Sequence, residues 1–129
     1  MAPKTQKIAK QGFKNSIGRQ GEDLALAFLV QKGWQLVDRN WTNRYGEIDL
    51  IVQKEQEIRF VEVKARRTLE YGYPEASVTR TKLTHLRRAL EIWLSRAKIS
   101  PKIYQIDVIA VLWTKGIEKP AITWIENVF

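Results

Sequence analysis

Two apolar segments separated by a short polar stretch constrain the fold of this chain more than any other feature. Residues 45–52 have the sequence YGEIDLIV and residues 58–64 have IRFVEVK, with QKEQE between them. Each segment is typical of a β-strand, and the apolar residues of the second occupy both parities, which indicates burial on both faces. Buried strands rarely carry charge without a partner or a function. Asp49, Glu62 and Lys64 are therefore candidates for a functional site.

The alternation of side chains along a strand places Glu62 and Lys64 on one face, about 7 Å apart. If the strands form an antiparallel hairpin closed by an even-length loop, Asp49 faces Phe60 or Glu62 on that same side. An odd-length loop or a bulge would break this relationship. Converging carboxylates repel each other unless a cation lies between them, and Mg²⁺ would satisfy both. A lysine beside such a site can orient or deprotonate a water, or neutralise charge in the transition state.

The spacing of these residues resembles the PD-(D/E)XK motif of the restriction-endonuclease-like nuclease superfamily. Neighbouring segments resemble the bacterial YraN family, a branch of that superfamily: GRQGE at 18–22, Asn40, GEIDLI at 46–51, FVEVKAR at 60–66 and IDVIAV at 106–111. The resemblance covers residues 18–129. The motif's proline is absent before Asp49, and Gln-Ile stands before Asp107 where the family usually has Arg-Phe. The second departure touches the start of a strand and not the predicted metal site.

The resemblance implies an α/β fold with a restriction-endonuclease-like core, in which α-helices flank a central mixed β-sheet in the order αβββαβ. It implies a nuclease that uses Mg²⁺ or Mn²⁺, with Asp49 and Glu62 as ligands and Lys64 at the attacking water or the phosphate. By pattern alone, Glu22 is an acid near a helix N-terminus that interacts with the helix dipole. The resemblance instead assigns Glu22 to the metal or its water. Asp107 is a weaker candidate for ordering that end of the site.

The remaining elements agree with that core. We expect helices over residues 16–32 and 81–97 and strands over 35–42, 104–113 and 121–125, with a turn at Lys115-Gly116. A sheet with a helix on each side is the natural packing of this order. The chain of 129 residues is long enough for one domain, which we place at residues 16–129. Residues 1–15 contain four lysines and no acid, and we expect a disordered basic tail.

The charge of the chain favours a polyanionic partner. Lys and Arg number 22 against 14 Asp and Glu, a net charge of +8. Nucleic acid, above all DNA, is the expected partner, and solubility alone is the simpler alternative. The sequence has no cysteine, which excludes disulfides and thiolate zinc sites. It also lacks an apolar run of about 20 residues and a secretory signal, so we expect a cytoplasmic protein with no membrane contact.

Six basic residues are the candidates for binding phosphates: Arg66, Arg67, Arg80, Lys82, Arg87 and Arg88. Arg66 and Arg67 leave the sheet beside the carboxylates, where ordinary loop charge is the alternative. A cation at a helix start opposes the dipole, so Arg80 and Lys82 need another justification.

Aromatic residues and the single histidine offer weaker signals. Tyr71 and Tyr73 could stack on bases, although we expect at least one of them to pack the loop down. His85 is expected to be structural or exposed and not catalytic.

The functional hypothesis is a metal-dependent endonuclease directed by the structure of its substrate and not by base sequence, because no element resembles a reader of base edges. The alternative is a non-catalytic nucleic-acid-binding module that keeps the nuclease fold. A third hypothesis is an interaction protein whose basic helix binds an acidic partner. A homodimer is left open, by analogy with junction-cutting nucleases.

Overall fold

The computed structural model describes residues 16–114 and 119–129. The basic tail expected at residues 1–15 and the turn expected at Lys115-Gly116 lie outside the described residues. The described elements are α2 (Ile17–Gln31), β1 (Gln35–Asn43), β2 (Gly46–Lys54), β3 (Glu57–Arg66), the short 3-10 helix η1 (Pro74–Ser77), α3 (Arg80–Ala97), β4 (Ile103–Leu112) and β5 (Ala121–Ile125). The predicted helices and strands are therefore confirmed, with boundaries that shift by one or two residues.

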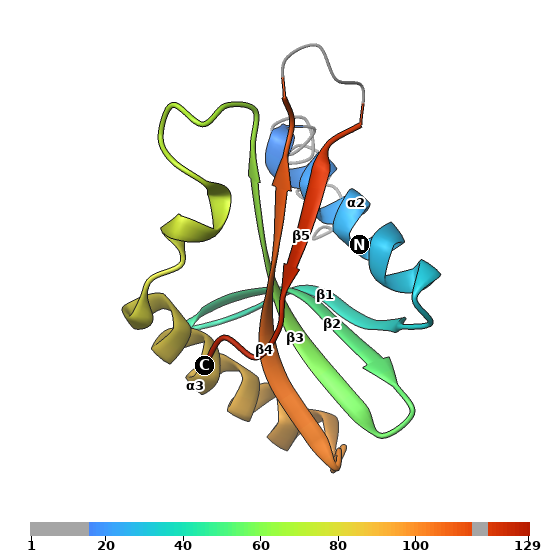
Figure 1. The fold of residues 1–129 in the computed structure, drawn as a ribbon. Helices are drawn as coiled ribbons and strands as arrows, with labels where there is room; N and C mark the ends of the chain where they lie inside the picture. Colours follow the sequence, from blue (N-terminus) through green and yellow to red (C-terminus); the bar gives the residue numbers. More distant parts are fainter. Residues whose placement is uncertain (1–15, 115–118) are drawn as a thin grey trace, which may run out of the picture.

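A single five-stranded sheet has the order β1-β2-β3-β4-β5 (Figure 1). The pairs β1/β2, β2/β3 and β4/β5 are antiparallel, and β3/β4 is parallel. The connection between the two parallel strands contains α3, as parallel pairs require a crossover. This mixed sheet with two helices confirms the α/β class and is consistent with a restriction-endonuclease-like core. β5 adds one strand to the order αβββαβ.

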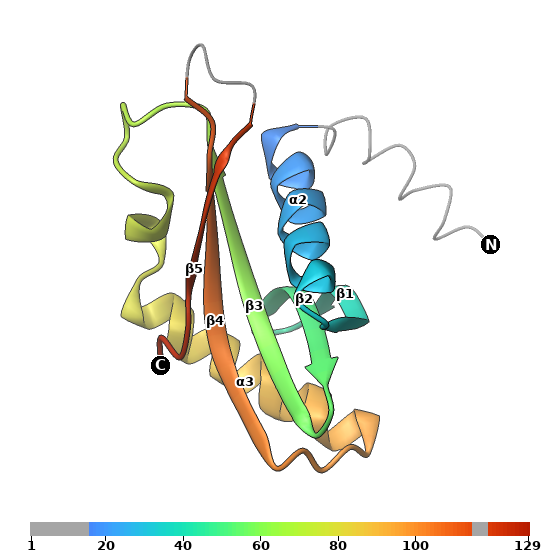
Figure 2. The same ribbon diagram turned by 45° about the vertical axis from the view of Figure 1, so that its right-hand side comes forward.

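The two faces of the sheet bury two separate cores (Figure 2). On one face, Ala25 and Leu29 of α2 pack against strand residues that include Val61. On the other face, α3 packs against strand residues that include Phe60. Burial of β3 on both sides explains the continuous apolar run in its sequence.

The β2–β3 hairpin closes through a two-residue loop, because Lys54 pairs with Glu57. The prediction that Asp49 faces Phe60 or Glu62 required a loop of even length, as found here. Pairing continues to Leu50↔Val61 and then stops, although β3 continues to pair with β4 as far as Arg66. β2 therefore leaves β3 at the level of Asp49, and Figure 1 shows β1 and β2 turning away from the far half of β3.

Helix α2 approaches β3 closely through Gly21. A Cβ built on this buried glycine would lie 2.6 Å from Cβ of Ala65, closer than two non-bonded carbon atoms can approach. Glycine therefore allows the helix backbone to lie directly on the strand, as glycines do at close element contacts. Glu22, the next residue, is fixed beside β3 as a result.

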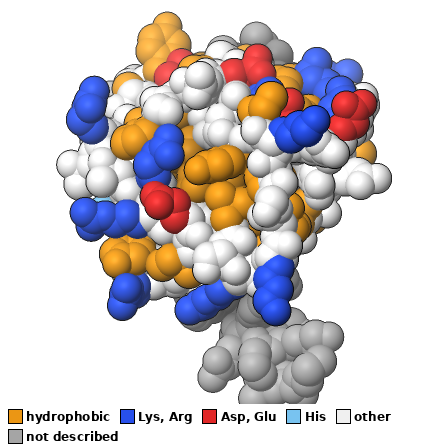
Figure 3. All heavy atoms as spheres, turned by 90° about the horizontal axis from the view of Figure 1, so that it is seen from below, with side chains coloured by type: hydrophobic (Ala, Val, Ile, Leu, Met, Phe, Trp, Pro, Cys, Tyr) orange, Lys and Arg blue, Asp and Glu red, His pale blue; other side chains and the backbone are white. Residues whose placement is uncertain are grey.

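One face of the molecule combines basic and apolar side chains. Seen from below, Lys and Arg side chains surround a group of hydrophobic side chains, with few acidic ones between them (Figure 3). In the described parts of the chain, neither helix is long and apolar enough to cross a lipid bilayer.

Candidate functional site

A pocket of about 360 Å³ opens where β2 leaves β3. Its lining residues come from α2, β2, β3 and the first turn of α3: Gly18, Glu22, Glu47, Asp49, Glu62, Val63, Lys64 and Lys82. All four residues predicted as catalytic line this one pocket. Lys82 is the only one of the six predicted phosphate-binding residues to do so.

Three carboxylates converge at the pocket. Ligand oxygens of Glu22, Glu47 and Asp49 all lie within 4.8 Å of one another. Glu47 joins this cluster from β2. Its shared parity with Asp49 along β2 was the signal for this position. Glu62 lines the same pocket from β3 but is not in the 4.8 Å group.

Asp49 is held in place by the backbone of β3. Its Oδ2 accepts a hydrogen bond of 2.8 Å from the N–H of Val63, and the side chain is almost fully buried. Burial raises the pKa of Asp49 well above its usual range, and the nearby carboxylates of Glu62 and Glu22 raise it further. The bond from Val63 opposes this shift without cancelling it.

Glu62 has a buried oxygen without a hydrogen bond. The residue is 5% exposed, and Oε2 has no hydrogen-bond partner among the described residues. The nearest cation is Nζ of Lys82 at 3.7 Å, which is an ion-pair distance but too long for a hydrogen bond. A buried carboxylate oxygen that faces a pocket in this way is suited to a ligand that supplies positive charge.

Lys64 and Lys82 are the cations of the pocket. Lys64 is partly buried, and burial lowers its pKa, with a further lowering from the adjacent Lys82. The carboxylates of Glu62 and Asp49 act in the opposite direction. The site therefore holds an amine that loses its proton more easily than an ordinary lysine.

Asn40 belongs to the segments that resemble the YraN family, but no role was predicted for it. In the structure it orients two carboxylates of the cluster. Its Nδ2 donates to Oε1 of Glu22 at 3.0 Å and to Oε1 of Glu47 at 3.4 Å. Asn40 has φ +50° within β1, a conformation that asparagine adopts more readily than most residues. Arg39 approaches Glu22 from the same strand, at 3.7 Å. These residues lie behind the cluster and orient two of its carboxylates.

The other predicted phosphate-binding residues do not line the pocket. Arg67 and Arg80 are exposed at the two ends of the segment between β3 and α3, and Arg66 is partly buried beside Arg67. Further along α3, Arg87 lies over the ring of Phe129 and Arg88 over the ring of Tyr45. His85 is exposed, as predicted.

Asp107 does not line the pocket, so the prediction that it orders the site is replaced by a structural role. It is fully buried and accepts hydrogen bonds from Arg59 (2.7 Å) and from Gln105, Trp124 and Asn127 (each 2.9 Å). No role was predicted for Arg59 from the sequence. These hydrogen bonds connect β3, β4, β5 and the residues that follow β5.

The expectation that Tyr71 or Tyr73 packs the loop down is wrong. Both side chains are exposed, Tyr71 by 75% and Tyr73 by 59%. The residue that packs down in this segment is Pro74, which is buried at the start of η1.

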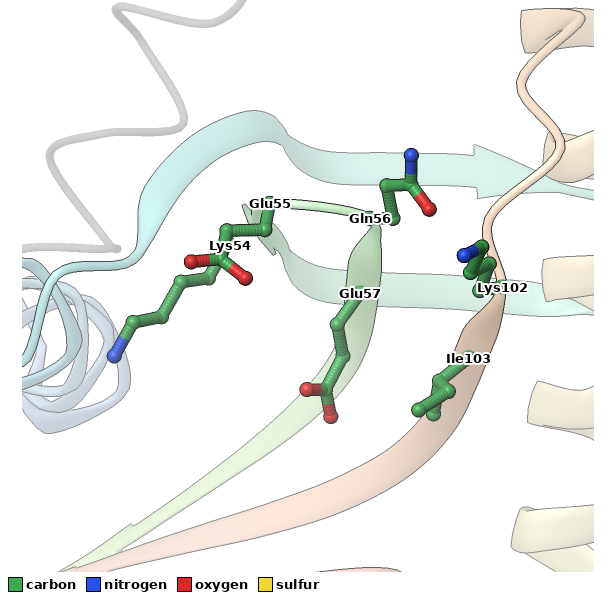
Figure 4. A pocket seen from close by; sticks show the side chains of 6 residues that line it. All are labelled: Lys54, Glu55, Gln56, Glu57, Lys102 and Ile103. Atoms are coloured by element: carbon green, nitrogen blue, oxygen red, sulfur yellow. The ribbon is translucent and has the colours of Figure 1, made fainter.

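A second hollow lies at the other end of β3, beside the loop that joins β2 to β3 (Figure 4). Its lining residues are Lys54, Glu55, Gln56, Glu57, Lys102 and Ile103. Figure 4 shows their side chains pointing in different directions, with no convergence of like groups. The carboxylate pocket is therefore the candidate site.

The chain resembles proteins from many bacteria. Residues 21–111 match the model of the uncharacterised protein family UPF0102. A UPF0102 protein of Nocardia farcinica is 42% identical over 122 residues, which is 95% of each chain. One from Caldicellulosiruptor saccharolyticus is 38% identical over 116 residues, covering 90% of this chain and 98% of that protein. One from Syntrophomonas wolfei is 40% identical over 118 residues, covering 91% and 100%. The chain therefore belongs to the UPF0102 family, which is the YraN family.

Proposed function

We propose that this protein is a Mg²⁺-dependent or Mn²⁺-dependent nuclease that hydrolyses phosphodiester bonds in DNA. One observation carries the proposal: Glu22, Glu47 and Asp49 converge within 4.8 Å in an open pocket that also holds the buried Glu62 and the amine of Lys64. Carboxylate oxygens are the ligands that such cations prefer. The family relationship is compatible with this activity but does not assign one.

The donor set of the pocket fits a divalent cation. Four carboxylates face two lysines, and burial together with the repulsion among the carboxylates holds the pKa of Asp49 high. Asp49, Glu62 and Glu22 would hold the ion, with Glu47 as a further ligand. When bound, the ion would polarise a phosphoryl oxygen and lower the pKa of a bound water.

The residues of the chain have separate roles in this proposal. The bond from Val63 fixes the orientation of Asp49, and Asn40 fixes Glu22 and Glu47. Lys64, with its lowered pKa, would orient or deprotonate the attacking water, or stabilise the charge that develops on the phosphate.

Binding of DNA would depend on the basic residues around the pocket. Lys82 would take a phosphate next to the scissile bond, and Arg66, Arg67 and Arg80 would take phosphates further along the strand. Phosphate contacts carry no sequence information, so we expect recognition by shape and a strong dependence of affinity on salt. Arg87 and Arg88 would extend this surface along α3.

A second candidate is a nucleic-acid-binding module that does not cleave. It is favoured by the contacts that already satisfy part of the acidic cluster, namely Asn40 with Glu22 and Glu47, and Lys82 with Glu62. In this case the cluster would be a structural network and the pocket would bind no metal.

Calorimetric titration with Mg²⁺ and Mn²⁺ separates the two candidates. Asp49→Asn is the sharpest variant, because asparagine retains an acceptor for the Val63 N–H and removes only the charge. Wild-type protein should bind metal and cleave duplex, forked or single-stranded DNA only when metal is present, and Asp49→Asn should do neither. Wild-type protein that binds DNA but binds no metal and cleaves none of these substrates would establish the binding module.

A further inference from the structure

The segment between β3 and α3 carries three exposed apolar side chains and joins two elements that line the pocket. Leu69, Tyr71 and Tyr73 are 47%, 75% and 59% exposed. Exposed apolar residues are ordinary when they occur singly, but these three stand at alternate positions of one short stretch and two of them are aromatic. An aromatic patch of this kind is suited to binding.

The backbone under these side chains is held in place. The N–H of Gly72 donates to the carbonyl of Leu69 at 2.8 Å, and the N–H of Glu70 donates to Oγ1 of Thr68 at 3.1 Å. Beyond this turn, Pro74 is buried and η1 packs against β3 and β4. The two tyrosine rings therefore project from an anchored turn and need little ordering when a partner binds.

A residue that lines the pocket stands near each end of the segment in sequence. The segment begins three residues after Lys64, about 10 Å along the strand direction, and it returns to α3 just before Lys82 (Figure 1). One strand of DNA advances about 3.4 Å per nucleotide in a duplex, so this distance corresponds to about three nucleotides. A strand with a phosphate at Lys64 would therefore bring bases to the start of this segment, and the tyrosines follow from there.

The charges around the segment favour nucleic acid as its occupant. Arg66 and Arg67 precede the tyrosines, and Arg80 and Lys82 follow them. Aromatic rings between cations are the pattern with which proteins bind single-stranded nucleic acid, where bases stack on the rings and cations contact the phosphates. Stacking requires bases whose faces are free, which a continuous duplex does not offer.

We infer that Tyr71 and Tyr73 stack on unpaired bases, so that the substrate of the pocket is DNA with a single-stranded part next to the scissile phosphate, such as a fork or a flap. This inference rests on the proposed function for the role of the pocket. The stacking itself is a property of binding and is measured without cleavage.

The experiment measures binding by fluorescence anisotropy in EDTA at one fixed salt concentration. The probes are a single strand, a forked duplex, a blunt duplex, and a single strand that carries abasic sites at its central positions. The variants are the double substitutions Tyr71→Ala with Tyr73→Ala, and Tyr71→Phe with Tyr73→Phe. Both rings are exposed, so neither double variant should alter folding, and the phenylalanine pair keeps the stacking surface.

The alanine pair should weaken binding to the single strand and the fork by on the order of tenfold for each stacked base, and leave the blunt duplex unchanged. The phenylalanine pair should bind like wild type. The abasic strand keeps its phosphates but lacks the bases that would stack on the rings. It should therefore bind wild-type protein weakly, and it should bind the alanine pair with the same affinity.

Two results would overturn the inference. Equal loss on the duplex and on the single strand would show that the rings contact DNA without stacking on unpaired bases. No loss on either probe would leave the tyrosines to a protein partner. Both results leave the proposed nuclease function intact. If wild-type protein binds none of the four DNA probes, the inference and the proposed function are both wrong.

Discussion

Val63 donates its backbone N–H to Oδ2 of Asp49 at 2.8 Å, at the level where the pairing of β2 with β3 ends. The Asp49 side chain thus accepts the hydrogen bond that a backbone carbonyl of β2 would accept if the two strands stayed paired. This substitution satisfies a buried donor while the two strands separate, and the separation makes room for the pocket. The same bond orients the carboxylate on which the proposed metal site depends.

Asp49→Asn should stabilise the metal-free protein at neutral pH. The folded state raises the pKa of Asp49, so ionisation of this carboxyl opposes folding. The penalty is absent below the unfolded pKa of about 3.9, grows as the pH rises through the folded pKa, and is complete above it. At pH 7 the melting temperature of the variant should exceed that of wild type by about 3–6 °C, the shift for roughly 1 kcal/mol in a chain of this size.

Thermal unfolding followed by circular dichroism at pH 3 and pH 7 checks this expectation, and the difference should vanish at pH 3. Glu70→Gln, which removes an exposed carboxylate, is the control and should change neither curve. Addition of Mg²⁺ should raise the melting temperature of wild type but not of Asp49→Asn. A variant that melts at or below the wild-type temperature at pH 7 would contradict the raised pKa of Asp49 in the folded protein.

Gly21→Ala should destabilise the fold by about 1–3 kcal/mol, the usual cost of adding a methyl group where none fits. The new Cβ would lie 2.6 Å from Cβ of Ala65, so α2 and β3 must move apart. Gly18→Ala is the matched control in the same helix, because its Cβ would meet only Oγ of Ser16 at 3.8 Å. This control should be neutral or stabilising by up to about 1 kcal/mol.

Urea denaturation of the two glycine variants gives both free energies. Because Glu22 follows Gly21, the displaced helix should also weaken metal binding in Gly21→Ala. Ala65→Gly combined with Gly21→Ala should recover part of the stability by removing the clashing methyl group. Equal stabilities for the two single glycine variants would refute the close contact.

The sequence predicted the β2–β3 part of the site because two local rules decide it. Alternation along a strand and an even loop are enough to place Asp49 and Glu62 on one side of the sheet. The point at which β2 leaves β3 was not predictable, since no local pattern in the two strands marks where their pairing ends. The inclusion of Glu47 in the cluster follows from that departure.

Contacts between distant elements were the least predictable. Lys82 reaches Glu62 only because α3 packs across the sheet, and no local pattern fixes that position. Arg59 and Asp107 are 48 residues apart, and the sequence gives no sign of which carboxylate a buried arginine will bind. The family resemblance supplied Glu22, whose pattern alone favoured an ordinary interaction with the helix dipole.

Arg59→Met should destabilise the protein by about 3–5 kcal/mol, because it leaves the fully buried carboxylate of Asp107 without its cation. Arg59 also contacts Glu57 and Glu126, so three acceptors share one guanidinium. Arg59→Lys should rescue little, since an ammonium group cannot reproduce the planar donor geometry. Chemical denaturation of both variants checks this.

Lys102→Met is the control for the arginine variants, because it removes an exposed cation and should cost under about 0.5 kcal/mol. Combining Arg59→Met with Asp107→Asn should cost less than the sum of the two single substitutions, because the carboxylate that the first leaves unpaired is then absent. Simple additivity would indicate that the two residues act independently.

Lys82→Met should raise the pKa of Lys64. Burial is the main reason that the pKa of Lys64 lies below its ordinary value of 10.5, and Lys82 is the next. Titration of the lysine side chains by NMR should show the Lys64 midpoint below 10.5 in wild type and a shift to higher pH in the variant. Lys98→Met, which removes an exposed cation at the far end of α3, should leave the midpoint unchanged. An unchanged or lower midpoint in Lys82→Met would mean that the two amines do not interact, and Lys64 would then owe its low pKa to burial alone.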